Sequence, residues 1–173
     1  MKNKQKRILQ SFHEKDGRYQ YTGDSFRLMK NEEQKVSPLT RLTIYCILAF
    51  LVVVYSGTLD TAAAFGAFYV ILPYVGEVSA LFMLVWNFIR LVYSKDNMRS
   101  YILDHIRARI PGAAAVLSVC ALVGIVCSLF YLFQHGTGGQ QAASILYLIC
   151  KGLTVLFALG CRETFRKLDW EKL

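Results

Sequence analysis

Charged residues are scarce in this chain. They make up 18% of its 173 residues, against about 25% in a typical soluble domain. Hydrophobic residues make up 54% of the chain, and they are clustered in long runs. The length suggests one domain, but the composition is too apolar for a typical soluble one.

Motifs of the common enzyme classes are also missing. The chain has no HExxH, no GxSxG, no nucleotide-binding loop and no paired carboxylates. Its three histidines, His13, His105 and His135, lie in separate regions. No basic stripe with interleaved aromatics indicates nucleic-acid binding, despite a net charge of +8. We therefore expect a protein that is not an enzyme and that binds no metal, cofactor or nucleic acid.

Disulfide and metal-binding cysteine patterns are absent too. No CxxC occurs, and all five cysteines fall in apolar segments, where free thiols behave as small buried hydrophobic groups. No apolar stretch of signal-peptide type directly follows the basic N-terminus, so we expect no cleaved leader. The cysteines are Cys46, Cys120, Cys127, Cys150 and Cys161.

What the sequence does contain is four segments of membrane-spanning length, which needs about 20 apolar residues. They are residues 42–59, 62–94, 112–133 and 142–161. The second is too long for one upright helix. It could tilt, project into the cytoplasm or break, and we favour a helix kinked near Pro73 and Gly76, because proline removes a backbone hydrogen bond. The predicted fold is an all-α integral membrane protein, a four-transmembrane-helix bundle built as two helical hairpins.

Basic residues predict the orientation of this bundle. Ten of the 20 Lys and Arg residues lie in residues 1–41, five in 90–109 and four in the C-terminal tail. The connections "SGTLDT" and "QHGTGGQQ" have none. By the positive-inside rule, both termini and the middle loop are cytoplasmic. We expect a multi-pass protein of the plasma (inner) membrane whose basic residues contact anionic headgroups.

The predicted cytoplasmic parts are an N-terminal segment, 1–40, and a tail, 163–173, on either side of a transmembrane domain, 41–162. Residues 17–28 alternate aromatic and polar around "TGD", which indicates a β-hairpin. Its aromatic face packs on the protein or headgroups, or else docks a partner.

The middle loop predicts a further helix. Met98, Ile102, Ile106 and Ile110 recur every four residues, and Pro111 follows. This pattern favours an amphipathic helix in the headgroup layer that ends at Pro111. A rigid stalk continuing the second span is the alternative.

Two charges inside the spans stand out. Lys151 is nine residues into the fourth span, at a depth of about 13 Å, and Glu77 is about 10 Å into the second. A lone charge at mid-bilayer costs about 2.5–3.5 kcal/mol, so we expect the two to pair across the bundle. The pair either fixes helix register or forms an ion, proton or substrate site.

Small residues mark a close-packing face on the third span. Cys120, Gly124 and Ser128 recur every four residues, which lets helix backbones approach closely. Packing within the bundle and a homodimer face are both open. Altogether the sequence favours an anchoring or accessory subunit of a membrane complex. The alternative is a small oligomeric transporter or channel that uses Glu77 and Lys151, and a membrane enzyme is a distant third.

Overall fold

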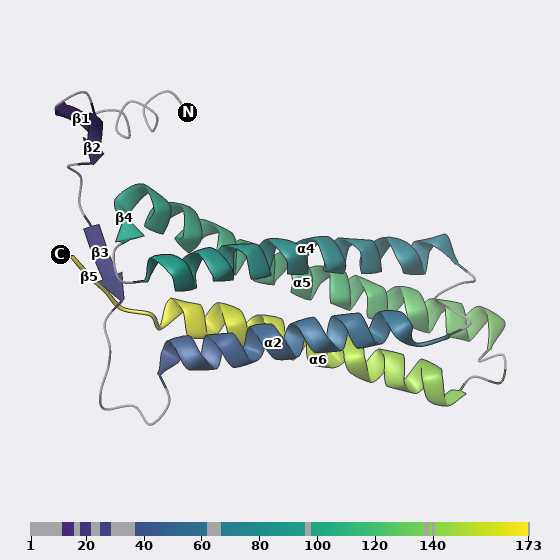
Figure 1. Cartoon of the computed structure of the whole chain (residues 1–173). Helices are drawn as coiled ribbons and strands as arrows, with labels where there is room; N and C mark the ends of the chain where they lie inside the picture. The colour runs from purple at the N-terminus through teal and green to yellow at the C-terminus, as the bar shows by residue number, and fades with distance from the viewer. Residues whose placement is uncertain are drawn as a thin grey trace.

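Four helices make up most of the chain. The computed structural model describes residues 12–15, 18–21, 25–28, 37–61, 67–95, 98–136, 139 and 141–172. Each of the four helices is long and apolar enough to cross a membrane. In chain order they are α2 (Pro38–Thr58), α4 (Phe68–Ser94), α5 (Ser100–His135) and α6 (Gln141–Arg166) (Figure 1).

The helices lie side by side as an antiparallel bundle. α4 packs against α5, α5 against α6, and α6 against α2, whereas α2 and α4 meet less extensively. The described strands gather at the end of the bundle where α2 begins and α6 ends (Figure 1). This arrangement places α4 and α6 diagonally opposite each other, with α5 packed against both.

The first helix begins earlier than its apolar run. The Ser37 hydroxyl accepts a hydrogen bond from the Thr40 amide at 3.2 Å, and Pro38 occupies the first helical turn. A serine cap followed by proline is a favourable helix start. α2 therefore spans Pro38–Thr58 rather than the expected 42–59.

The over-long second span is shorter than expected. α4 begins at Phe68 rather than at residue 62, after an extended Ala67. Its 27 residues correspond to about 40 Å, which a modest tilt accommodates. Pro73 lies inside the helix, which continues through it and through Gly76. The predicted bend at this point stays a prediction.

The third span corrects the expectation of a separate interfacial helix. Residues 100–135 form one continuous helix, α5, with Pro111 inside it rather than at its end. Ile106 and Ile110 are buried, at 0% and 1% exposure, in the same core cluster as Leu91. The apolar stripe therefore packs against the bundle, not against headgroups. Because that packing holds both sides of Pro111 in helix, one lost hydrogen bond does not end it.

The strands correct the expectation of a hairpin over residues 17–28. β1 (Phe12–Lys15) pairs antiparallel with β2 (Arg18–Tyr21), and Asp16 and Gly17 separate them in the sequence. Asp-Gly is among the strongest two-residue hairpin signals. The turn therefore lies at Asp16 and Gly17 and not at "TGD". Residues 22–24 lie outside the described part of the chain.

A three-stranded sheet was not expected at all. β3 (Ser25–Leu28) lies between β4 (Met98–Arg99) and β5 (Trp170–Lys172), antiparallel to both. Phe26, Leu28 and Trp170 pack against the hydrophobic core. The sheet thus joins the N-terminal segment, the middle loop and the C-terminal tail at one end of the bundle.

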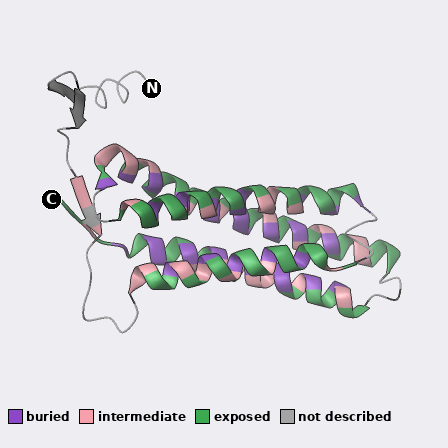
Figure 2. Ribbon diagram, in the orientation of Figure 1, coloured by how far each residue is buried: buried purple, intermediate pink, exposed green. Residues whose placement is uncertain are grey.

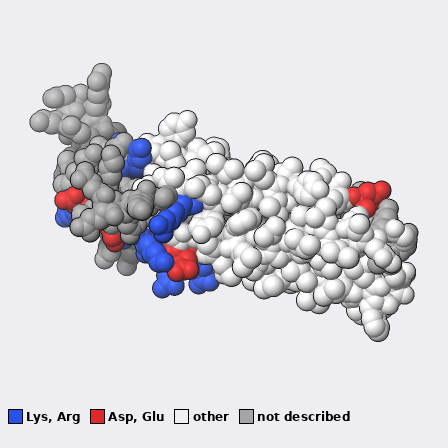
Figure 3. Space-filling model, turned by 90° about the horizontal axis from the view of Figure 1, so that it is seen from below, with Lys and Arg blue, Asp and Glu red and all other residues white. Residues whose placement is uncertain are grey.

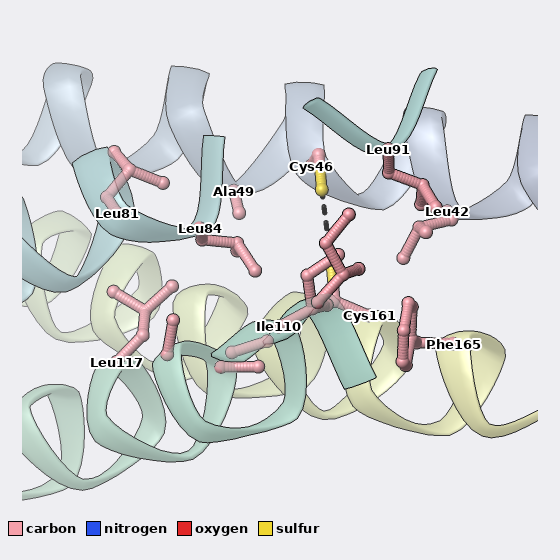
Figure 4. Close-up of a cluster of buried hydrophobic side chains, with 14 of the residues drawn as sticks. Leu42, Cys46, Ala49, Leu81, Leu84, Leu91, Ile110, Leu117, Cys161 and Phe165 are labelled. Atoms are coloured by element: carbon pink, nitrogen blue, oxygen red, sulfur yellow. Dashed lines mark hydrogen bonds between the residues drawn. The ribbon is translucent and has the colours of Figure 1, made fainter. Parts of the chain in front are cut away.

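The hydrophobic core is concentrated toward this end. Side chains from all four helices meet there, and the Cys46 and Cys161 sulfurs lie 3.7 Å apart (Figure 4). Figure 2 shows exposed residues along the outward faces of the helices. Large apolar residues are among them, such as Phe82 and Leu156. Such surfaces suit a lipid environment.

Candidate functional site: a buried ion pair

The site consists of one acid and one base from diagonally opposite helices. Glu77 lies in α4, one turn after Pro73, and Lys151 lies in the middle of α6. The Lys151 Nζ donates to both carboxylate oxygens of Glu77, each at 2.7 Å. Both side chains are 0% exposed. The structure thus brings together Glu77 and Lys151, the two charges that the sequence predicts to pair.

Gly124 makes room for this contact. α5 lies between α4 and α6, and a Cβ at Gly124 would be 3.3 Å from the Glu77 Oε1 and 3.7 Å from the Lys151 Cε. The same Cβ would be 3.8 Å from the Pro73 Cβ. The missing side chain therefore allows α5 to pass directly beside the ion pair. In the sequence this glycine was assigned only to a packing stripe.

Two tyrosines complete the surroundings of the lysine. The Lys151 Nζ lies 4.7 Å from the Tyr74 ring centroid and 4.8 Å from that of Tyr147. An ammonium within about 6 Å of an aromatic face is attracted by the ring quadrupole. The cation thus has the carboxylate and two aromatic rings in place of water.

Tyr74 also connects the site to α2. Its hydroxyl donates to the Val53 carbonyl at 3.4 Å, across the less extensive α2–α4 contact. A Cβ at Gly57 would overlap this hydroxyl. Gly57 is therefore part of the support of the site, because only a residue without a side chain admits Tyr74.

Sequence reasoning missed these supporting residues, although a signal for the tyrosines was present. Tyr74 precedes Glu77 by three residues and Tyr147 precedes Lys151 by four. Those spacings place each tyrosine on the same helix face as its charged neighbour. The need for glycine at position 57 has no such signal.

The other predicted residues line the α4–α5 and α5–α6 contacts. A Cβ at Gly76 would lie 2.9 Å from the Cys120 sulfur, so the two helices touch closely there. Ser128, on the same face of α5, is buried at 1% exposure. Pro73 is buried beside Gly124. The stripe of Cys120, Gly124 and Ser128 thus serves contacts within the bundle.

Hydroxyl groups on the two sides of the pair differ in their hydrogen bonding. On the strand-bearing side, Ser118 and Thr154 donate to carbonyls of their own helices, at 3.0 and 2.9 Å. On the other side, the Ser144 hydroxyl is buried with no hydrogen-bond partner among the described residues, whereas Ser128 lies within reach of the Tyr147 hydroxyl. Among the described residues, a buried hydroxyl without a partner thus lies on the side of the pair away from the strands.

The chemistry of the arrangement is that of a closed ion pair. Lys151 engages both oxygens of the only carboxylate it contacts in the described structure. Charge-assisted bonds of this kind are stronger than neutral ones. Among the described residues, no three His, Cys, Asp or Glu side chains gather as metal ligands. No family model, curated protein or solved structure matches this chain.

Proposed function

We propose that the chain is an integral membrane protein that crosses the plasma (inner) membrane through α2, α4, α5 and α6. The described Lys and Arg residues other than Lys151 lie within the strand-bearing third of these helices or beyond it. On the face in Figure 3 the blue side chains gather at this end, and the long middle section carries neither blue nor red. By the positive-inside rule, this supports a cytoplasmic sheet and cytoplasmic termini.

Within that membrane, the protein acts as an anchoring or accessory subunit of a larger complex. One observation carries this proposal: Glu77 and Lys151 satisfy each other at 2.7 Å and are both 0% exposed. A buried pair of this kind fixes which helices face each other and at what register. It offers no open coordination position to a passing ion.

The cytoplasmic sheet supports a role in assembly. β3 holds segments from three parts of the chain together, and Glu171 and Lys172 of β5 are exposed. A structured surface beyond the membrane gives a partner something to recognise that headgroups do not cover. The bundle would then hold that surface at a fixed height above the bilayer.

Site-specific photo-crosslinking in native membranes tests this function. A photoreactive amino acid at Glu171, which is exposed on β5, is expected to crosslink a discrete partner. The matched control is the same amino acid at Asp60, which is exposed at the opposite end of the bundle. A protein that runs at its own monomer mass in mild detergent and gives no crosslink from Glu171 is not a subunit of a complex.

A small oligomeric transporter or channel is the second candidate. The buried Ser144 hydroxyl, which has no partner among the described residues, favours it, because a polar species that enters from that side of the ion pair could contact it. Flux measured in proteoliposomes tests it. Ion or proton flux that disappears in Lys151→Met, and does not return when Glu77→Gln is added, would favour this candidate over the anchor.

A further inference from the structure

The outward face of α4 carries a groove that is separate from the ion pair. The groove has a volume of about 340 Å³ and lies near the strand-bearing end of the helix. Spacings of three and four residues place its lining on one face of α4. The described residues that line it are Trp86, Ile89, Arg90, Tyr93 and Ser94.

The lining changes character along the helix axis. Trp86 and Ile89, toward the middle of the bundle, offer apolar surface, and Trp86 is 71% exposed. Tyr93 and Ser94, toward the strands, offer hydroxyl groups. Eight residues separate Trp86 from Ser94, which corresponds to about 12 Å of helix. One molecule with an apolar part and a polar part can therefore contact both ends.

Arg90 lies between these two parts. It is exposed, and it is the charged residue among the described lining of the groove. The salt bridges in which both partners are described join Lys151 to Glu77 and Lys167 to Glu163, so no described carboxylate pairs with Arg90. A guanidinium binds phosphate through two parallel hydrogen bonds, which a lysine does not reproduce.

We propose that this groove binds one anionic phospholipid, with its phosphate on Arg90, its headgroup at Tyr93 and Ser94, and an acyl chain along Ile89 and Trp86. The inference rests on the proposed membrane location of α4. It goes beyond a general attraction of basic residues to the bilayer, because it assigns a particular site. A free phosphate ion would satisfy Arg90 but would leave the apolar half of the groove without a partner.

The position of Trp86 provides a direct probe of acyl-chain binding. The chain has two tryptophans, and the other, Trp170, lies in β5. A Trp170→Phe background leaves Trp86 as the only indole. The full-length protein is reconstituted into phosphatidylcholine vesicles that contain either phosphatidylglycerol or phosphatidylcholine with brominated acyl chains. Bromine quenches an indole that it contacts.

Brominated phosphatidylglycerol is expected to quench Trp86 at a lower mole fraction than brominated phosphatidylcholine. Arg90→Gln is expected to weaken this preference about tenfold, because it removes a charge-assisted bidentate contact. Arg162→Gln is the matched control, since Arg162 is also exposed near the strand-bearing end but lies on α6. It removes the same charge and is expected to leave the preference within about fivefold of the starting value.

Three results would overturn the site. They are equal quenching by both lipids, an equal loss of preference in Arg90→Gln and Arg162→Gln, or release of brominated phosphatidylglycerol by millimolar inorganic phosphate. Absence of quenching by either lipid would instead contradict the membrane location of α4, and with it the proposed function. If Arg90→Gln does not fold, Arg90→Lys replaces it. A full preference in Arg90→Lys would then contradict bidentate recognition.

Discussion

Breaking the ion pair from one side should cost far more stability than removing it entirely. Glu77→Gln leaves the Lys151 ammonium without a counter-charge, and Lys151→Met leaves the carboxylate without a donor, each at 0% exposure. Loss of one partner of a buried pair costs about 3–5 kcal/mol. The double variant has no buried charge and is expected to recover much of that loss, although the glutamine amide that it keeps costs about 1–3 kcal/mol if it stays unpaired.

The measurement is reversible unfolding in detergent micelles, followed by the loss of helical circular dichroism as denaturing detergent is added. The coupling between the two substitutions should then be about 3 kcal/mol or more, well above the 0.3–0.5 kcal/mol scatter of independent sites. Ser118→Ala combined with Lys151→Met is the control. The Ser118 hydroxyl donates to its own helix, at the Ala114 carbonyl, and not to the pair. This combination should be additive.

Additive losses in the Glu77→Gln, Lys151→Met double variant would refute the reasoning. They would mean that the two charges do not stabilise each other and that α4 and α6 are held in register by other contacts. Recovered stability has a further use. If cellular function returns with it, the pair serves register alone, and if function stays lost, one of the charges has a role beyond stability.

Three other tests concern the residues that support the ion pair and the proposed orientation of the protein in the membrane. Gly124→Leu should destabilise the bundle by about 1–3 kcal/mol in the same unfolding assay, because its side chain must displace α5 from Glu77 and Lys151; unchanged stability would show that α5 has space there. Gly57→Ala should push Tyr74 from its position and destabilise the bundle. Adding Tyr74→Phe removes the overlapping hydroxyl and should recover part of the lost stability. If the two losses of stability are additive, Gly57 and Tyr74 are not in contact. A cysteine at Gly138 should react with an impermeant thiol reagent in intact cells, with Ser37→Cys at the cytoplasmic end as the protected control; labelling of the Gly138 cysteine only after permeabilisation would reverse the topology.

The ion pair was predictable from sequence because the cost of a lone charge in an apolar bundle is general. Glu77 and Lys151 are the ionisable residues deepest in the apolar runs, and their similar depth left each with one evident partner. The four long apolar helices were predictable on similar grounds, since a run that is to span a membrane has to cover about 30 Å of hydrocarbon. In both cases one energetic requirement, which can be evaluated from the sequence alone, restricts the possible structures to a few.

The errors arose where the deciding contact lies far away in the chain. Proline at position 111 signals a helix end locally, but packing of Ile106 and Ile110 against the other helices overrides it. No feature of the β3 sequence predicts that this strand pairs with Met98–Arg99 and Trp170–Lys172 instead of with β2, the strand next to it in the chain. The fit of Tyr74 against Gly57 depends on a side-chain direction that no spacing rule specifies.

The pairing of β3 with β5 sets an order of events during synthesis. β3 comes before α2 and β5 comes after α6, so the central strand of the sheet cannot gain its second neighbour until α2, α4, α5 and α6 have all been made. Closing so long a loop is favourable only once its ends are held near each other. Packing of the helices should therefore precede completion of the sheet. A docking surface that includes β5 would consequently exist only on chains whose bundle is already assembled.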